Sequence, residues 1–520
     1  MFTLRRSLFA VALLPAALAA QSPARRALPP RVGPAKGTVI VVGGGAMGPE
    51  IYDRFMAAAG GPDALIIDVP NAGGGDAYPQ DHAGVRGWKL AGAKNVYTLF
   101  TKDRKIADSD SFVAIIKKAG GVWFEGGRQF HLVDAYAGTK TEAAFNEVLA
   151  RGGVVGGSSA GASILGDFLV RGAPSNDNFV MDYPGYEKGF SYLRGVGIDQ
   201  HVVARERLAD LADSILPKYP KLLAISEDEG TAWVVRGDTA SIIGRNKAFV
   251  YGGNANDEGK PFLTLYPGDT YDLGARRVTH RAAAESPVAA KFVAQLFAKY
   301  EAPAAGGATV LVARDGKVFV DRSFGIGPQP KYMPTTTVPQ FPLGGITAAF
   351  TAICDQVPEP PPARGGRGAA PPDSGTPAPP AGRGRGARAP QSPFQRCVTG
   401  RLSTPVGLHK TSANEAGDVQ SDVDELYRLA LGLEQPLTYT RGAPNDASAP
   451  REGIDRTKGW ASDVYRGTTR LAVYGTADGK RHAFVRFPDA HATIIILTND
   501  DAADARAMAE RIAEQLLAKP

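Results

Sequence analysis

The segment Gly152–Leu165 reads Gly-Gly-Val-Val-Gly-Gly-Ser-Ser-Ala-Gly-Ala-Ser-Ile-Leu and decides the fold of the first half of the chain. The two valines predict a buried strand, the small residues a tight turn, and the apolar positions that follow predict a helix. Within the turn, residues 157–161 have the Gly-x-Ser-x-Gly spacing, in which small residues allow a sharp bend that exposes the central hydroxyl. Ser159 is therefore a candidate nucleophile, whereas a plain turn with helix-capping serines is the alternative.

Strand and helix patterns alternate before and around this segment. Strands are predicted at residues 39–42, 65–68, 95–100 and 122–124, and helices at 110–119 and from 140 to about 151. This alternation predicts a parallel sheet covered by helices on both faces. Ligands bind at the carboxyl ends of such strands, where Gly126 and Gly127 follow the fourth strand.

The first predicted strand runs into Gly43-x-Gly45-x-x-Gly48, and Asp68 ends the next strand. This spacing meets the dinucleotide-binding fingerprint, so a Rossmann-type nucleotide-binding oxidoreductase is one alternative. Glycines are also expected at the first turn of any doubly wound fold, and a cofactor site would leave the serine turn unexplained. We therefore expect no cofactor. With only two cysteines, we also expect no cysteine-rich metal site, and we predict no metal.

A candidate base lies in the stretch Ile198-Asp199-Gln200-His201. His201 has polar neighbours and does not belong to an apolar stripe, which distinguishes it from the other six histidines. A serine hydroxyl is a poor nucleophile until a base accepts its proton, and a neutral imidazole does so near neutral pH. A structural, hydrogen-bonded histidine is the alternative.

Four stretches together, residues 126–129, 157–162, 199–207 and 228–232, resemble the cyanophycinase branch of the S51 serine peptidases. The resemblance covers roughly residues 37–280 and implies an α/β fold, a flavodoxin-like three-layer sandwich related to the class I glutamine amidotransferases. It implies that Ser159 is the nucleophile, His201 the general base and Glu229 the carboxylate that orients the imidazole. Asp177 is the alternative third member. The chain order Ser, His, acid also differs from that of the α/β-hydrolases.

The resemblance also implies the surroundings of the triad. Backbone N–H groups near Gly127 and Ala160 would form an oxyanion hole at a helix N-terminus. The residues implied in oxyanion or substrate binding are Gly126, Gly127, Gln129, Ala160, Asp199, Gln200, Arg205 and Arg207. Arg128 departs from the usual Asn or Asp, and Asp210 stands where cyanophycin-degrading members have a third arginine.

These departures put a cyanophycin polymer substrate in doubt. We expect a serine-type peptidase that acts on isopeptide or acidic, β-aspartyl-type peptide bonds, with a peptide or poly-amino-acid substrate. A catalytically idle binding protein on the same fold is the alternative of a different class. The net charge of +6 partly reflects arginines outside the predicted domains, so no nucleic-acid partner is expected.

Residues 307–520 resemble, more faintly, the serine β-lactamase and penicillin-binding-like hydrolases. Residues 309–318 resemble their opening hairpin, 489–499 their last core strand and 502–517 their closing helix. Gly345 and Ala348 stand where a Ser-x-x-Lys motif is expected, and Val473–Gly475 where Lys/His-Thr/Ser-Gly is expected. Without the serine and the lysine this acyl-transfer chemistry has no nucleophile, so a degenerate α+β domain is predicted.

The remaining segments complete the predicted organisation. Residues 1–20 are predicted to be a secretory signal, 21–36 a linker, 281–306 a helical connector and 358–393 a disordered Pro/Gly/Arg-rich insert. We therefore expect a periplasmic or secreted protein without membrane contact after signal cleavage, and leave a homodimer open. Cys354 and Cys397 bracket the insert, and in an oxidising compartment we predict that they form a disulfide.

Overall fold

The computed structural model of the protein describes residues 31–175, 177, 179–257, 259–282, 288–301, 307–325, 340–357, 391–434 and 455–518. The predicted signal at 1–20, most of the linker and most of the insert at 358–393 lie outside these residues. The predictions made for them therefore stay predictions. The described residues from 31 onward form one compact unit.

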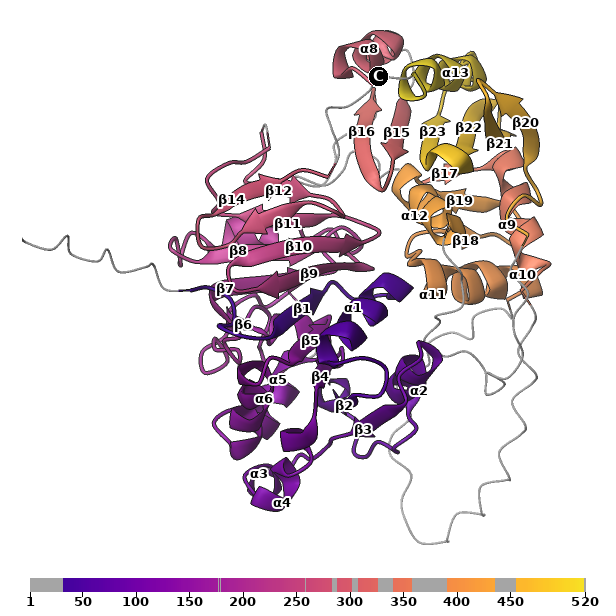
Figure 1. Ribbon diagram of the computed structural model, residues 1–520. Helices are drawn as coiled ribbons and strands as arrows, with labels where there is room; N and C mark the ends of the chain where they lie inside the picture. Colours follow the sequence, from indigo (N-terminus) through magenta and orange to yellow (C-terminus); the bar gives the residue numbers. More distant parts are fainter. Residues whose placement is uncertain are drawn as a thin grey trace, which may run out of the picture. The chain divides into compact units, whose positions relative to one another are not determined.

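A nine-stranded sheet has the order β14-β13-β10-β9-β1-β5-β4-β2-β3 (Figure 1). Five neighbouring strands pair in parallel, and they are β1 (Thr38–Val42), β5 (Val154–Ser158), β4 (Gly121–Phe124), β2 (Leu65–Val69) and β3 (Asn95–Thr98). The antiparallel extension consists of β9 (Thr231–Arg236), β10 (Thr239–Gly244), β13 (Thr270–Asp272) and β14 (Arg277–His280).

Helices cover both faces of the parallel strands because successive residues of a strand point to opposite faces. In β1, Ile40 and Val42 pack with α1 (Pro49–Ala59) and α2 (Ala83–Leu90). Val39 and Val41 belong to the core on the other face, which α3 (Arg104–Ala107), α4 (Asp110–Val113), α5 (Gln129–Tyr136) and α6 (Lys140–Ala150) join. The predicted helix at 110–119 is shorter than expected, because a 3₁₀ turn, η2 (Ile116–Lys118), follows α4.

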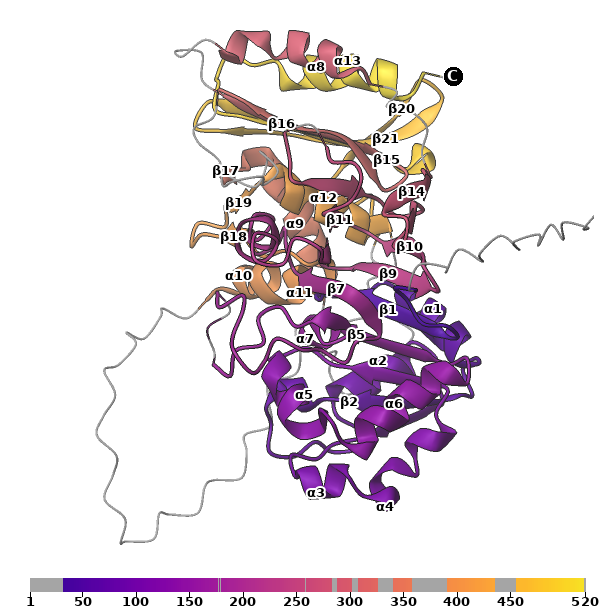
Figure 2. The same cartoon turned by 90° about the vertical axis from the view of Figure 1, so that its left-hand side faces the viewer.

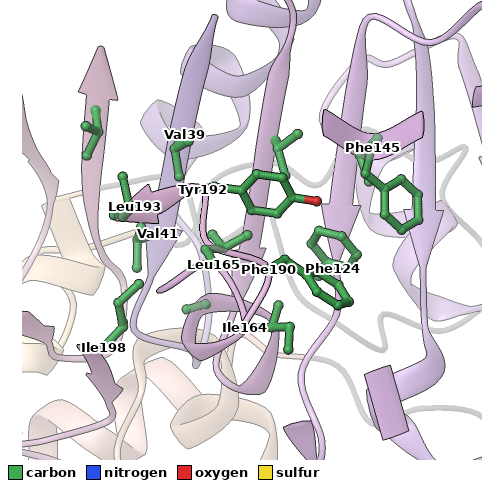
Figure 3. Packing of buried hydrophobic residues seen from close by; sticks show 14 of the residues in the cluster. Val39, Val41, Phe124, Phe145, Ile164, Leu165, Phe190, Tyr192, Leu193 and Ile198 are labelled. Atoms are coloured by element: carbon green, nitrogen blue, oxygen red, sulfur yellow. The ribbon is translucent and has the colours of Figure 1, made fainter. Parts of the chain in front are cut away.

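A second sheet of five strands has the order β12-β11-β8-β7-β6. In it β6 (Gly166–Phe168), β7 (Leu193–Gln200) and β8 (Leu223–Glu227) are parallel, whereas β11 (Ala248–Tyr251) and β12 (Phe262–Leu265) are antiparallel. Leu193 and Ile198 of this sheet share one core with Val39 and Val41 of the first (Figure 3). The predicted α/β class is confirmed, while the division of the later strands into two sheets was not anticipated.

The C-terminal module is built on a six-stranded antiparallel sheet of order β16-β15-β23-β22-β21-β20. Its strands are β15 (Ala308–Arg314), β16 (Lys317–Phe324), β20 (Ala461–Tyr465), β21 (Thr468–Ala477), β22 (Lys480–Phe487) and β23 (Ala492–Thr498). Helices α8 (Ala290–Leu296) and α13 (Ala505–Leu516) cover one face, and α9 (Thr347–Cys354) and α12 (Val423–Glu434) the other (Figure 2). These layers are compatible with a β-lactamase-like domain.

Short elements complete the description. A small sheet joins β17 (Phe341–Pro342), β19 (Val419–Ser421) and β18 (Ser412–Ala413). The remaining helices and turns are η1 (Asn71–Gly73), α7 (Ala160–Ser163), η3 (Leu211–Ile215), η4 (Ala298–Glu301), η5 (Gly344–Ile346), α10 (Pro393–Arg396), η6 (Cys397–Leu402), α11 (Ser403–Val406) and η7 (Pro488–Ala490). Among the described residues, no helix has both the length and the apolar character needed to cross a bilayer.

The two motif positions that the resemblance aligns in the C-terminal module lie in direct backbone contact. A Cβ atom at Gly345 would lie 2.5 Å from the carbonyl oxygen of Tyr474, and one at Gly475 would lie 2.2 Å from that of Leu343. Both separations are far below van der Waals contact, so no side chain fits between η5 and β21. This part of the module therefore has no room for a serine nucleophile between helix and strand.

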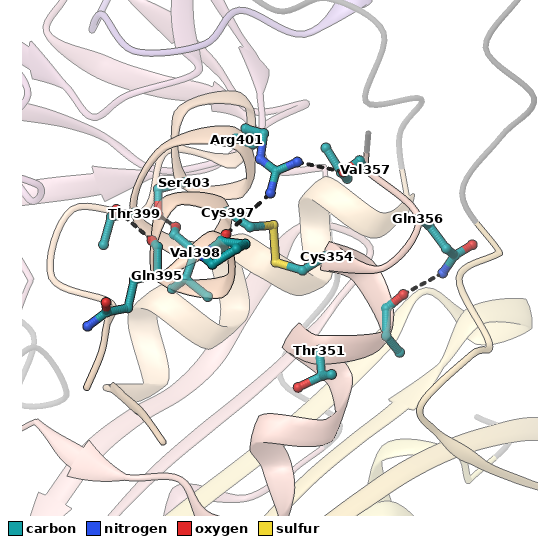
Figure 4. The surroundings of a disulfide bond; sticks show 12 residues. Thr351, Cys354, Gln356, Val357, Gln395, Cys397, Val398, Thr399, Arg401 and Ser403 are labelled. Carbon is teal, nitrogen blue, oxygen red and sulfur yellow. Dashed lines mark hydrogen bonds between the residues drawn. A yellow bond between two sulfur atoms is a disulfide. The ribbon is translucent and has the colours of Figure 1, made fainter. Parts of the chain in front are cut away.

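Cys354 and Cys397 form a disulfide with their Cα atoms 5.8 Å apart (Figure 4). The bridge joins the end of α9 to the start of η6. Arg401 adds a second link between the same segments by donating from Nη1 to the carbonyl oxygen of Val357, at 2.7 Å. The predicted disulfide is confirmed.

Candidate active site

Ser159 lies in the turn between β5 and α7, with φ 58° and ψ −119°. An L-residue rarely adopts this conformation, and such strain is typical of a nucleophile held on a sharp strand-to-helix turn. The flanking glycines make the turn possible. A Cβ atom at Gly157 would lie 2.1 Å from the carbonyl oxygen of Gly161, and one at Gly161 would lie 2.1 Å from that of Phe124.

His201 directly follows β7 in the second sheet and is also left-handed, with φ 57°. Its backbone N–H donates to the carbonyl oxygen of Gly43, at 3.1 Å, which ties it to the end of β1. Its ring nitrogen Nε2 lies 2.7 Å from Ser159 Oγ. The two side chains are thus within hydrogen-bonding distance, as the roles of nucleophile and base require.

Glu229 lies between β8 and β9 and is buried. Its Oε1 forms a short hydrogen bond with His201 Nδ1, the ring nitrogen that faces away from Ser159. The alternative, Asp177, is exposed, and its carboxylate accepts from the backbone N–H of Phe179, at 2.7 Å. Of the two acids considered, Glu229 is the one that the structure brings to the imidazole.

The protonation states in this cluster suit a general base. Burial lowers the pKa of His201 and outweighs the opposing effect of the hydrogen bond with Glu229, so the neutral ring is favoured. Burial alone would raise the pKa of Glu229, but its hydrogen bonds with His201 and His409 lower it well below the usual range. The pair is therefore a neutral imidazole beside a carboxylate, as in a catalytic triad.

The glycines of the first turn make room for these side chains. A Cβ atom at Gly44, where φ is 99°, would lie 2.1 Å from His201 Cε1, and one at Gly45 would lie 2.4 Å from Glu229 Oε2. Asp68, the acid of the fingerprint, is fully buried and lies 2.9 Å from His82 Nε2. Packing against the histidine and the glutamate thus accounts for Gly44 and Gly45, of which Gly45 belongs to the fingerprint.

The glycine pair after β4 lies against the nucleophile. A Cβ atom at Gly126 would lie 3.1 Å from Ser159 Cβ. Gly127 has φ 147°, and a Cβ atom there would lie 1.9 Å from the carbonyl oxygen of Ala72. The oxyanion hole implied for the backbone N–H groups near Gly127 and Ala160 stays a prediction.

Three residues implied in substrate binding are buried and bonded within the protein. The Asp199 carboxylate accepts two hydrogen bonds from Arg171, both at 2.8 Å, and Arg171 also donates to Asp210 at 2.6 Å. Gln129 Nε2 donates to the carbonyl oxygen of Val170, and Gln200 Nε2 lies 3.4 Å from Ser163 Oγ. The structure does not bring these three side chains to the surface, so contact with substrate stays a prediction.

The two arginines implied in substrate binding, Arg205 and Arg207, remain as candidates to bind a negatively charged ligand. Arg205 is exposed. Arg207 is 6% exposed, and its Nη1 has no hydrogen-bond partner within the part of the chain that the structure describes. Burial lowers the pKa of Arg207 to about 10, so the side chain is still a cation at neutral pH.

A pocket opens beside Ser159. Its wall includes Ser158, which precedes Ser159 in the chain, and Gly126, which lies against Ser159 in space. The other lining residues are mostly apolar or aromatic, with one carboxylate, and they are Gly45, Ala46, Met47, Tyr52, Ala83, Gly84, Gly87, Trp88, Leu90, Trp123 and Glu125. A concave surface thus lies next to Ser159, the candidate nucleophile.

Asp68, His82 and Glu125 are buried and close enough to share a metal ion. His82 Nε2, however, lies 2.9 Å from Asp68 Oδ2 and 3.4 Å from Glu125 Oε1. Burial alone would lower the pKa of His82, but the hydrogen bonds to both carboxylates raise it to about 10. A proton on the imidazole therefore satisfies the two acids, and we describe the group as an ion-pair cluster.

One residue at the site was not predicted from the sequence. His409, in the C-terminal module, places its Nε2 2.5 Å from Glu229 Oε2, the oxygen that His201 leaves free. In the sequence it was one of six histidines without an assigned role. The tandem acids Asp228 and Glu229 were the available signal, because buried carboxylates require cationic or hydrogen-bonding partners.

Comparisons of the sequence with known proteins point to one family. The family model described as Peptidase family S51 matches residues 51–243. The cyanophycinase of Geminocystis herdmanii (strain PCC 6308) is 30% identical over 230 residues, which cover 42% of this chain and 82% of the relative. The cyanophycinase of Synechococcus elongatus is 27% identical over 267 residues, or 47% of this chain and 82% of the relative. A solved peptidase from an acI-B1 Actinobacterium is 24% identical, with 46% of this chain and 98% of that chain covered and a TM-score of 0.37.

Proposed function

The chain belongs to peptidase family S51, and from this premise we propose that it hydrolyses isopeptide or acidic, β-aspartyl-type peptide bonds with Ser159, His201 and Glu229 as its catalytic triad. The observation that supports this best is the continuous hydrogen-bonded line from Ser159 Oγ through both ring nitrogens of His201 to Glu229. Membership of the family makes the chain a serine-type peptidase. The triad, the bond cleaved and export are our proposals.

In the proposed mechanism, His201 Nε2 accepts the proton of Ser159 as Oγ attacks the scissile carbonyl carbon. Glu229 stays ionised and stabilises the imidazolium through Nδ1. Backbone N–H groups near Gly127 and Ala160 would stabilise the oxyanion. The imidazolium then protonates the leaving amine, and His201 next activates a water molecule that hydrolyses the acyl-enzyme.

Charge near the triad supports an acidic substrate. Arg207 has a buried guanidinium nitrogen without a described hydrogen-bond partner, and Arg205 is exposed two residues earlier. A guanidinium binds a carboxylate strongly because its N–H groups match the two oxygens. An aspartyl residue in the substrate would offer such a carboxylate. Asp210 stands where cyanophycin-degrading members have a third arginine, so this chain has one positive charge fewer for a cyanophycin substrate.

Export is proposed from the signal pattern of residues 1–20, and the disulfide between Cys354 and Cys397 is the kind of bond that persists in an oxidising compartment. N-terminal sequencing of the protein recovered from a periplasmic fraction should find a chain that begins near Gln21. Recovery only from the cytoplasm with Met1 intact would contradict export.

The function is tested with the purified chain, a fluorophosphonate probe, and a panel of cyanophycin, β-aspartyl and α-aspartyl peptides. We expect hydrolysis of at least one acidic substrate and a loss of about 10⁴-fold or more in Ser159→Ala, with folding preserved, since alanine is small enough for the turn. Ser158→Ala, which removes the neighbouring hydroxyl, should retain labelling. An unlabelled, inactive but folded wild-type chain would favour the idle binding protein instead.

A further inference from the structure

We propose that the C-terminal module supplies a positioning residue to the hydrolase site, in that His409 holds the Glu229 carboxylate in the orientation that His201 requires. The proposal rests on the proposed triad. It gives the module a role although no side chain fits at the position aligned with a serine, between η5 and β21.

The two oxygens of Glu229 are bound by two imidazoles. Oε1 bonds to His201 Nδ1, and Oε2 lies 2.5 Å from His409 Nε2. A rotation of the carboxylate that weakens one of these bonds also weakens the other. A second hydrogen bond on the same carboxylate reduces the freedom of that carboxylate to turn. The oxygen that orients a catalytic imidazole must stay in place through the reaction, so this restraint favours the reactive geometry.

The loop that carries His409 is itself fixed by α12. Backbone N–H groups of His409, Lys410 and Thr411 all donate to Glu425 Oε2, at 2.8, 3.0 and 3.1 Å. Two residues before His409, Gly407 has φ 74°, and a Cβ atom there would lie 3.5 Å from Glu229 Oε2. The loop therefore passes directly over the triad carboxylate.

Further ion pairs tie the same module to both sides of the triad. Arg428 of α12 forms a short hydrogen bond with Asp228, the neighbour of Glu229, and a second with Asp424 at 3.0 Å. Asp228 in turn accepts from the backbone N–H of Ala204, three residues after His201, at 3.0 Å. The Arg428 and Asp228 side chains are 2% and 1% exposed. Separating them would leave the buried Asp228 carboxylate without Arg428, its cationic partner, so this contact is costly to break.

His409 also changes the charge around the base. The charged groups that face it are Glu229, Arg428 and Glu425, and those that face His201 are Glu229, Arg205 and Asp228. Burial alone would lower the pKa of His409, but its hydrogen bond to Glu229 raises it, so the ring gains positive charge near neutral pH. The positive charge of His409 partly compensates the negative charge of Glu229. Glu229 therefore raises the pKa of His201 less than it would without His409.

The experiment uses the full chain and measures the second-order rate constant for fluorophosphonate labelling of Ser159 as a function of pH. Removal of a hydrogen bond to a charged group predicts that His409→Ala lowers this rate about 10- to 100-fold. His409→Gln, which keeps an amide donor but no charge, should restore part of the rate and move the acidic limb of the pH profile to higher pH. His491→Asn is the matched control, since His491 is an exposed, left-handed histidine of the same module, and it should change neither quantity.

The outcomes separate this proposal from the proposed function. Labelling of folded His409→Ala at the wild-type rate and with the wild-type pH profile would overturn the positioning role while the triad survives. If His409→Ala unfolds, His409→Gln decides, and an unchanged pH profile there counts against the proposal. If the wild type is not labelled at all, the proposed function fails, and NMR titration of His201 with ¹⁵N-labelled histidine decides the coupling: an unchanged pKa of His201 in His409→Gln rejects it.

Discussion

Gly44→Ala tests whether a glycine is needed at position 44 to make room for His201, the proposed general base. The substitution adds one methyl group, and that group would lie 2.1 Å from His201 Cε1 and 2.3 Å from Nε2. Real Cβ atoms essentially never approach another heavy atom closer than 3.0 Å. The imidazole must therefore withdraw from Ser159 or the turn must deform.

The magnitude follows from two separate terms. An alanine in the left-handed conformation that Gly44 adopts costs about 1–2 kcal/mol of stability. Relief of the collision moves the ring by about 1 Å, and a misplacement of that size costs on the order of 10²-fold in rate. Gly44→Ala should thus lose about 100-fold in activity, a much larger effect than its modest loss of stability would cause.

Gly92→Ala is the matched control, because Gly92 has nearly the same backbone angle, φ 105° against 99°, with nothing within 4 Å of the added Cβ atom. Urea unfolding should give a similar loss of stability for both variants, while fluorophosphonate labelling should slow only in Gly44→Ala. Labelling of a folded Gly44→Ala protein at the rate of Gly92→Ala would refute the argument. It would also leave the glycine at position 44 without an explanation.

Two further changes test the scaffold. Removal of the disulfide in a Cys354→Ser, Cys397→Ser double variant should destabilise the C-terminal module by about 4 kcal/mol in the chain-entropy model, for a sequence separation of 43. Thermal unfolding of the variant and the wild type measures this loss of stability. Two alkylated thiols in the unreduced wild type would contradict the bridge. Arg171→Met should cost about 3–5 kcal/mol in urea unfolding, because it leaves the Asp199 carboxylate buried without its partner. Adding Asp199→Asn should recover part of that loss, and no recovery would count against the buried ion pair as its cause.

The local part of the site could be predicted from the sequence because it depends on backbone sterics. A serine between glycines at the end of an apolar strand has few conformations available, and the turn at Ser159 is the strained one that the spacing indicates. The carboxyl ends of β1, β4 and β5 meet because these strands are neighbours in a parallel sheet. His201 and Glu229 entered through the resemblance of four motifs, and the structure brings both to the serine.

The side-chain pairing around the triad could not be predicted in the same way. Asp199 and Gln200 lie in a motif that the resemblance assigns to substrate, yet both are buried at the end of β7. Asp199 is paired with Arg171, which lies 28 residues away in sequence and belongs to no motif. Charge pairing depends on which side chains meet in three dimensions, and neither strand nor helix periodicity encodes that.

His409 shows why the two halves of the chain could not be interpreted separately. Glu229 and Asp228 are buried carboxylates, and within the hydrolase sheets the described partners of their side chains are His201 for one and the Ala204 amide for the other. A buried charge that lacks compensation is expensive, so a hydrolase with these two acids needs further donors. His409 and Arg428 supply them from the other half of the chain. The position that the resemblance aligns with a serine is closed by the contact of Gly345 with Tyr474, while the loop after α11 is fixed by Glu425 of α12 and contacts Glu229. The segment aligned with the missing serine and the loop that carries His409 are therefore separate elements of the module, so the proposed positioning role does not depend on a serine motif at Gly345.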